Sequence, residues 1–400
     1  MNHWKQKFFL ITAGQTISLI GSSAVQFALI WWLASETDSP MMMAMAGLVA
    51  FIPQIILGPF AGVWVDRWKR KTVAICADLF LGVVALAFAG VFALGSPPYW
   101  TVCLVLGIRG AGGVFHTPAI QAIIPQLVPP DHLIRANGWS QFLQSGAFML
   151  GPVLGAALYA ACPMPIILLT DMLGAVIASG ALAMVKIPEI ERTDARLPNF
   201  LEEFKEGFRA LRADRQLFAL ALCAGLCMAF FLPLSSYYPL MASSYFAVSA
   251  WHGSVVELVY AAGMMITAFL FGSVLKVKRP LHVAYLGLVG MGVSSLACGL
   301  LPSHMWAYWV FAAACFFMGA SGNVYGIPFM AYLQQTIPPE SQGRVFSMIG
   351  TLSSLAMPLG LLLSSPVAER FGVPVWFLVT GIGVLTCVAV CKLIAGRSRE

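Results

Sequence analysis

Five ionisable side chains lie within long apolar segments of this sequence: Asp78, Arg109, His116, Asp171 and Glu257. A charge at the centre of a bilayer costs about 2.5–3.5 kcal/mol on insertion scales, so each group needs a partner or a task. A carboxylate held there favours its protonated form, because burial disfavours the charged one. The chemistry that these residue types allow is the uptake and release of protons inside a membrane.

The composition sets the class of protein that must position these groups. The chain has 400 residues, of which 59% are hydrophobic and 10% are charged, whereas a soluble domain carries about 25% charged residues. Apolar runs of about 20 residues recur along the sequence, and each can cross a bilayer as a helix. The runs do not alternate with polar residues, which excludes a membrane β-barrel. We therefore expect an all-α polytopic protein surrounded by the lipid bilayer.

Twelve transmembrane helices are predicted, at 8–33, 42–64, 72–94, 99–120, 138–160, 164–185, 216–242, 251–275, 280–301, 306–333, 342–365 and 374–395. With the N-terminus in the cytoplasm, nearly all Lys and Arg residues fall in cytoplasmic segments, as the positive-inside rule requires. Both termini are therefore expected in the cytoplasm, and the net charge of +6 reflects topology rather than a nucleic-acid partner. The first apolar run is a full span, so no cleavable signal peptide is expected.

The two halves of the sequence resemble each other. GGVFHTP at 112–118 and GNVYGIP at 322–328 share the pattern G-x-V-aromatic-x-x-P, and a Pro-Pro-acid triplet follows each of them. Such a duplication is typical of transporters built from two related six-helix halves.

The predicted domains follow from this duplication. Residues 1–185 and 216–400 form two six-helix bundles around a central cavity, and residues 186–215 form a cytoplasmic linker between them. Apolar residues at helical spacing predict an amphipathic helix in the linker: Phe200, Phe204, Phe208 and Leu211.

The stretch from Gly58 to Thr72, GPFAGVWVDRWKRKT, joins two predicted spans. It resembles the loop between helices 2 and 3 of major facilitator superfamily transporters, except that Lys69 replaces the usual Gly. The resemblance implies the major facilitator fold, and it implies that Asp66 holds the cytoplasmic side closed against the start of the eleventh span, close to Gly343. It assigns a conformational role to Gly62, Asp66, Arg67, Arg70 and Lys71.

A second motif lies in the fifth span. Gly151, Pro152 and Gly155, within LGPVLGAALY, resemble the helix-5 motif that the superfamily's exporters carry. The alternative is ordinary close packing, since Gly and Pro let membrane helices approach and bend.

Phrases spread over nearly the whole chain, among them AGQTISLI, FHTPAIQAIIPQLVPP and RVFSMIGTLSSLAMPLG, resemble the macrolide-efflux branch of the drug:proton antiporters. The resemblance implies export of a bulky amphiphilic drug across the cell inner membrane in exchange for protons, by a monomer without a cofactor. The same branch resembles siderophore exporters and lysophospholipid flippases, and both alternatives stay open. A receptor that binds the ligand without transporting it also stays open.

The ionisable side chains then receive expected roles. Glu257 is the expected main proton site and Asp171 an assisting one, because they are the two carboxylates in the outer half of the spans. Arg109 is expected to modulate both, and His116 is a further candidate. Structural alternatives remain: Arg109 could be a counter-ion, Asp171 could bond a neighbouring helix, and His116 could satisfy the backbone beside a proline. Asp78, near the loop cations, is interpreted as structural.

A drug pocket should be mostly apolar with a few polar groups. The expected substrate-binding residues are polar or amphipathic side chains within the spans: Gln15, Gln26, Trp31, Gln141, Gln144, Tyr237, Tyr238, Asn323 and Tyr325.

Catalytic and metal motifs are missing from the sequence. It contains no H-E-x2-H, no G-x-S-x-G and no nucleotide-binding loop, so an enzyme is not expected. The nine cysteines have no zinc-like spacing, and Cys223 and Cys227, one helical turn apart in an apolar run, are expected to pack rather than to bind a metal.

Overall fold

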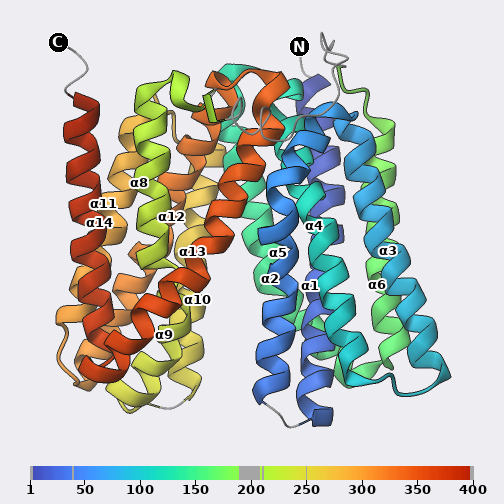
Figure 1. Ribbon diagram of the computed structural model, residues 1–400, viewed down its shortest axis with the longest axis horizontal. Helices are drawn as coiled ribbons and strands as arrows, with labels where there is room; N and C mark the ends of the chain where they lie inside the picture. The colour runs from blue at the N-terminus through green and yellow to red at the C-terminus, as the bar shows by residue number, and fades with distance from the viewer. Residues whose placement is uncertain (1–2, 38–39, 189–207, 210, 249, 397–400) are drawn as a thin grey trace. The chain divides into compact units, whose positions relative to one another are not determined.

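The computed structural model describes residues 3–37, 40–188, 208–209, 211–248 and 250–396 (Figure 1). These residues are almost entirely helical and contain no β-strand, which confirms the predicted all-α class. Within the described ranges, ten helices are long and apolar enough to cross a membrane. Most of the predicted linker, including Phe200 and Phe204, lies outside the described residues.

The chain divides into two compact units. The first comprises Met1–Ala136, Leu143–Phe208 and Ile337–Thr351. Its elements are α1 (His3–Thr37), α2 (Pro40–Arg67), α3 (Arg70–Leu94), α4 (Tyr99–Leu127), η1 (Pro130–His132), most of α5 (Leu133–Ala161), α6 (Met164–Met184), η3 (Pro339–Ser341) and the first turns of α13 (Gln342–Phe371).

The second unit comprises Asn137–Phe142, Arg209–Thr336 and Leu352–Glu400. Its elements are α8 (Arg215–Phe231), α9 (Leu234–Leu240), η2 (Met241–Tyr245), α10 (Ala250–Ser273), α11 (Pro280–Leu300), α12 (Met305–Thr336), the remainder of α13 and α14 (Val373–Gly396).

The same packing pattern occurs in both units. In the first, α1 packs on α6, α2 on α4, and α3 on both α4 and α6. In the second, α8 packs on α14, α10 on α12, and α11 on both α12 and α14. Pro118 lies inside α4 and Pro328 inside α12, and each helix leads through a short 3-10 turn into the next. The duplication seen in the sequence is therefore a duplication of structure.

Two of the predicted spans are not among the ten helices. The span 42–64 does form a helix, α2, of 28 residues, although α2 is not one of the ten. The span 216–242 is not a single helix, because α8 ends at Phe231 and α9 begins at Leu234. The break falls at Pro233, which has no N–H to continue the helical hydrogen bonding. After α9, the chain continues into the π-helical turn η2.

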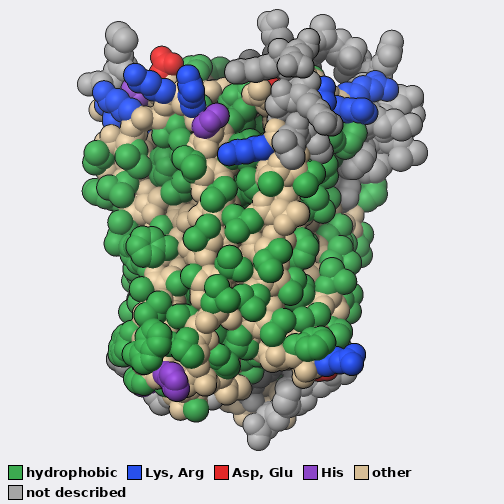
Figure 2. All heavy atoms as spheres, turned by 90° about the vertical axis from the view of Figure 1, so that its left-hand side faces the viewer, with side chains coloured by type: hydrophobic (Ala, Val, Ile, Leu, Met, Phe, Trp, Pro, Cys, Tyr) green, Lys and Arg blue, Asp and Glu red, His purple; other side chains and the backbone are tan. Residues whose placement is uncertain are grey.

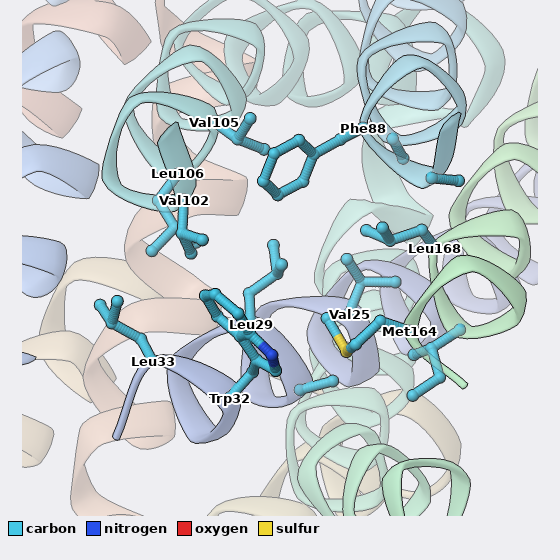
Figure 3. Close-up of a cluster of buried hydrophobic side chains, with 14 of the residues drawn as sticks. Val25, Leu29, Trp32, Leu33, Phe88, Val102, Val105, Leu106, Met164 and Leu168 are labelled. Carbon is cyan, nitrogen blue, oxygen red and sulfur yellow. The ribbon is translucent and has the colours of Figure 1, made fainter. Parts of the chain in front are cut away.

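Buried hydrophobic side chains hold the first unit together (Figure 3). Leu29 and Trp32 of α1 lie among Phe88 of α3, Leu106 of α4 and Leu168 of α6. Lipid is as apolar as these side chains, so membrane helices associate through tight packing rather than through the hydrophobic effect.

Small residues bring α1 and α6 into direct backbone contact. A Cβ added at Gly174 would lie 2.9 Å from the Cα of Ser18, so only glycine fits where these helices cross.

The outer surface is apolar, as a multi-pass membrane protein requires. Figure 2 shows hydrophobic side chains across the middle of one face, with Lys and Arg gathered mainly at its upper edge. Large side chains such as Leu286 and Val293 of α11 are 59% and 52% exposed, and a lipid environment would cover them.

Candidate functional site

Asp66, in the last turn of α2, caps the N-terminus of α13. Its Oδ1 accepts a hydrogen bond of 2.9 Å from the Gly343 amide, and its Oδ2 accepts one of 2.9 Å from the Arg344 amide. The first amides of a helix have no partner within the helix, and they favour a negative charge. Asp66 is 6% exposed. The carboxylate therefore contacts the start of the eleventh predicted span, which is the partner expected for it from the sequence.

Cations surround this carboxylate. Arg70 Nη2 lies 3.0 Å from Asp66 Oδ1, and Arg344 Nε lies 3.7 Å from Oδ2. Arg70 also donates to the Ala122 and Pro339 carbonyl oxygens, so it ties together α3, α4 and the turn before α13. Arg67, the residue after Asp66, is half-buried.

Lys71, in the same motif, contacts α6 instead of α13. Its Nζ donates to the carbonyl oxygens of Ala183 and Val185, at distances of 2.7 and 2.8 Å. A lysine at the C-terminal carbonyls of a helix is favourable for the helix dipole. Lys71 therefore fixes the end of α6.

Gly62 allows α2 to approach α13. A Cβ at this position would lie 2.7 Å from the Arg344 Cα and 2.7 Å from the Gly343 carbonyl oxygen. One turn earlier, the Gly58 carbonyl oxygen accepts a hydrogen bond from the Ser347 hydroxyl. Gly62 and Asp66 thus act on the same partner, one by close approach and the other by charge.

The second unit contains the counterpart of this contact without its acid. A Cβ at Gly272 of α10 would lie 3.2 Å from the Trp139 amide nitrogen, and one at Gly138 would lie 2.8 Å from the Phe271 carbonyl carbon. The repeats at 112–118 and 322–328 are 210 positions apart, and the same offset places Lys276 at the position of Asp66. Lys276 is exposed. The glycine packing is therefore duplicated, but the carboxylate cap is found only in the first copy of this contact.

Arg109 and Asp171 form a buried ion pair inside the first unit. Arg109 Nη1 of α4 pairs with Asp171 Oδ2 of α6, and the two residues are 8% and 1% exposed. Ser22 of α1 completes the site, since its hydroxyl donates to Asp171 Oδ1 at 2.7 Å. Arg109 Nη2 lies 3.1 Å from both the carbonyl oxygen and the hydroxyl of Ser22. We call Ser22, Arg109 and Asp171 the buried triad.

His116, Asp78 and Gln15 form a second polar cluster in the same unit. Gln15 Nε2 donates to Asp78 Oδ2 at 2.9 Å, and Gln15 Oε1 lies 2.9 Å from His116 Nε2. His116 Nε2 also lies 3.3 Å from Asp78 Oδ1, and Asp78 is 3% exposed. The partners of His116 are therefore the side chains of α1 and α3. Gln15, expected to bind substrate, belongs to this cluster.

Glu257 stands apart from both clusters. It lies on α10 and is exposed, and the structure records no ion pair or hydrogen bond between it and another described residue. Its role as the main proton site stays a prediction.

The expected substrate-binding residues separate into a buried group and an exposed group. In the second unit, Tyr237 pairs with the Ser364 hydroxyl at 2.7 Å, Tyr238 donates to Met318 Sδ at 3.2 Å, and Asn323 donates to the Met264 carbonyl oxygen at 2.7 Å. These three are at most 5% exposed.

The other expected substrate-binding side chains are more accessible. Tyr325 stacks on Phe329 at 5.2 Å and is half-buried, as is Gln141. The exposed ones are Gln26, Trp31 and Gln144.

The motif in α5 packs against α1. A Cβ at Gly155 would lie 2.7 Å from the Ala24 carbonyl oxygen, and one at Gly151 would overlap the Ser23 side chain. Pro152 lies within α5 between these glycines. Close helix packing is therefore the visible role of this motif.

The sequence did not single out Ser22, which holds both members of the buried ion pair. The available signal was Gly21, whose Cβ would lie 3.2 Å from the Thr170 carbonyl oxygen, so a close crossing of α1 and α6 sets Ser22 beside Asp171.

The described residues contain no group of three metal-binding side chains. Cys223 and Cys227 lie buried with their sulfurs 4.0 Å apart.

Known proteins resemble this chain over nearly all of its length. Macrolide efflux protein A of Streptococcus pyogenes is 39% identical over 394 residues, which cover 98% of this chain and 97% of the relative. Macrolide efflux protein A of Enterococcus faecalis is 37% identical over 324 residues, which cover 81% of this chain and 99% of the relative.

The fold is shared with solved transporter structures. A bacterial homologue of the iron transporter ferroportin, crystallised in an outward-facing state, superposes with a TM-score of 0.80 at 16% identity. The match covers 98% of this chain and 99% of that one. The family model described as Major Facilitator Superfamily matches residues 11–361. This multi-pass membrane chain is therefore a transporter that belongs to the Major Facilitator Superfamily.

Proposed function

We propose that this chain exports bulky amphiphilic drugs of the macrolide type across the cell membrane in exchange for protons, by alternating access. It acts as a monomer with both termini in the cytoplasm. The distribution of Lys and Arg along the sequence supports this orientation.

The substrate class is supported by the relatives. Two proteins named for macrolide efflux share 37–39% identity with this chain, and each is covered almost completely. The apolar spans, with few polar side chains between them, suit a large amphiphile better than a small polar solute.

The buried triad is the observation that supports the proposed proton coupling. In the arrangement described here, Asp171 has Arg109 as its counter-ion. If helix movement separates the two, Asp171 is left buried without its counter-ion, and protonation becomes the favourable way to neutralise it. Because α1, α4 and α6 each contribute one member of the triad, a movement of any of these helices would break a contact that holds the pair.

Two further groups are part of the proposal. His116 can pass a proton to or from Asp78, since its Nε2 lies 3.3 Å from the carboxylate. Glu257 is the candidate in the second unit, where it lies exposed on α10. The proposed coupling groups are therefore Asp171 with Arg109, His116 and Glu257.

Asp66 supplies the conformational element. Its hydrogen bonds to α13 stabilise one arrangement of the first unit, and their loss would favour another. We propose that this cap opens and closes during each transport cycle, together with the packing at Gly62.

Everted membrane vesicles provide the test. A proton gradient, acidic inside, should drive uptake of radiolabelled erythromycin into vesicles that carry this protein, and a protonophore should abolish that uptake. Asp171→Asn and Glu257→Gln should reduce uptake at equal protein levels, whereas Glu369→Gln, an exposed carboxylate at the end of α13, should not. Uptake of a siderophore or a lysophospholipid in place of erythromycin would contradict the proposed substrate class.

A further inference from the structure

An apolar groove lies on the surface of the first unit, over α2, α3 and α4. Its volume is about 680 Å³, within the usual range of small-molecule sites. We call it the α2–α4 groove. Its walls are mainly apolar, with Trp64 and Trp68 from α2 and its end, Phe80 from α3, and Phe115 from α4.

Stacked aromatic rings form one wall of this groove. The Trp64 ring stacks on Trp68, with centroids 6.2 Å apart, and on Phe115, with centroids 5.6 Å apart and planes 11° apart. Trp64 and Trp68 are 43% and 60% exposed, so the stack faces outward. Tryptophan is enriched where membrane helices meet the lipid headgroups, which places this wall at that level.

Cations line the same groove. Arg67 and Lys69 contribute to its lining beside Trp64 and Trp68, and Thr72 adds a hydroxyl. Among the described residues that line it, no Asp or Glu is present. A groove that is apolar along its length and cationic at one side complements an amphiphile with an anionic head, and it repels a cationic one.

We propose that the α2–α4 groove binds one anionic phospholipid from the leaflet next to the loop between α2 and α3. The acyl chain lies along Trp64, Phe80 and Phe115, and the phosphate is held by Arg67 and Lys69. Arg67 directly follows Asp66, the cap of α13, so the bound lipid sits beside the conformational element.

The chain carries its own reporter for this site. Cys76 lines the groove and is exposed, whereas the other eight cysteines are buried or half-buried. A lipid in the groove should therefore shield Cys76 from a water-soluble maleimide. The measurement compares the labelling rate of Cys76, identified by mass spectrometry of the digested protein, in nanodiscs of phosphatidylcholine with and without phosphatidylglycerol.

Phosphatidylglycerol should slow the labelling of Cys76 several-fold relative to phosphatidylcholine alone. The double variant Arg67→Gln/Lys69→Gln should weaken this protection, with an affinity for phosphatidylglycerol roughly thirtyfold lower, the loss expected for two cations near a lipid headgroup. The matched control is Lys276→Gln/Lys278→Gln, which removes two exposed cations from the loop between α10 and α11 and should keep the protection.

Three outcomes would overturn the proposal. Equal labelling in both lipid compositions would show that the groove does not select an anionic lipid. Protection by erythromycin, and not by phosphatidylglycerol, would make the groove a site for the exported drug. If both double variants lose the protection of Cys76 equally, the protection depends on the overall charge of the protein and not on a site in the groove. The comparison between lipids uses the unaltered protein, so it holds even if a variant fails to fold.

Discussion

The Asp66 carboxylate accepts a hydrogen bond of 2.9 Å from the Gly343 amide, although 277 positions separate the two residues in the chain. The bond joins the end of α2 to the first turn of α13. It shows that a short charged motif near the beginning of the sequence is part of a helix cap built with residues near its end.

Asp66→Asn should leave membrane insertion intact and reduce transport. The amide keeps one acceptor oxygen but loses the negative charge that the helix terminus and Arg70 favour, at a cost of about 0.3–2 kcal/mol in the capped state. Erythromycin uptake by everted vesicles measures the effect. Asp131→Asn is the control, because Asp131 is an exposed acid in the equivalent turn η1. Unchanged uptake by Asp66→Asn would reduce the motif to a marker of topology.

Gly62→Ala should disturb the same contact by volume instead of charge. The added Cβ would lie 2.7 Å from Arg344 and Gly343 atoms, and such overpacking costs about 1–3 kcal/mol. Both uptake and the melting temperature in detergent should fall. Gly90→Ala is the matched control, since apart from the adjoining helix backbone no atom of the described residues lies within 4 Å of the Cβ added there. Equal behaviour of the two variants would contradict the close approach of α2 and α13.

Replacing Arg109 or Asp171 alone should destabilise the protein more than replacing both together. Arg109→Gln or Asp171→Asn alone leaves a buried charge without its partner, and breaking such a pair costs about 3–5 kcal/mol. The double variant removes both charges and should regain much of the lost thermal stability. It should still fail to couple uptake to a proton gradient. If the double variant is less stable than either single one, the two charges do not act as a pair.

Tyr237→Phe tests whether an expected substrate residue is structural. Its hydroxyl shares a buried hydrogen bond with Ser364, and loss of one such bond costs about 0.5–1.5 kcal/mol. The melting temperature should therefore fall, with little change in the affinity for erythromycin. Tyr159→Phe is the control, since the Tyr159 hydroxyl contact with Ser35 is exposed. A large loss of affinity with unchanged stability would make Tyr237 a binding residue.

The positions of most helices could be predicted from the sequence because hydropathy and length determine them locally. The break at Pro233 could also have been foreseen, since a proline interrupts the hydrogen bonding of any helix. The contact of Asp66 with the start of α13 could be predicted from the loop motif, because the spacing and the charges of that motif resemble those of a known family.

The partners of the buried polar groups could not be predicted in the same way. Arg109 and Asp171 are 62 positions apart, and only the packing of α1, α4 and α6 brings them to Ser22. Serine is common in apolar helices, so its type alone gives no signal. Hydropathy likewise does not say that Glu257 of α10 is exposed.

Proton release from the purified protein tests the proposed antiport most directly. Erythromycin is added to the protein in weakly buffered detergent solution, and the pH change is compared among the parent, Asp171→Asn and Glu257→Gln, with Glu369→Gln as the control. If substrate and proton compete, the parent and the control release protons on drug binding, and Asp171→Asn releases far fewer. Equal proton release from the parent, Asp171→Asn and Glu257→Gln would contradict coupling through these carboxylates.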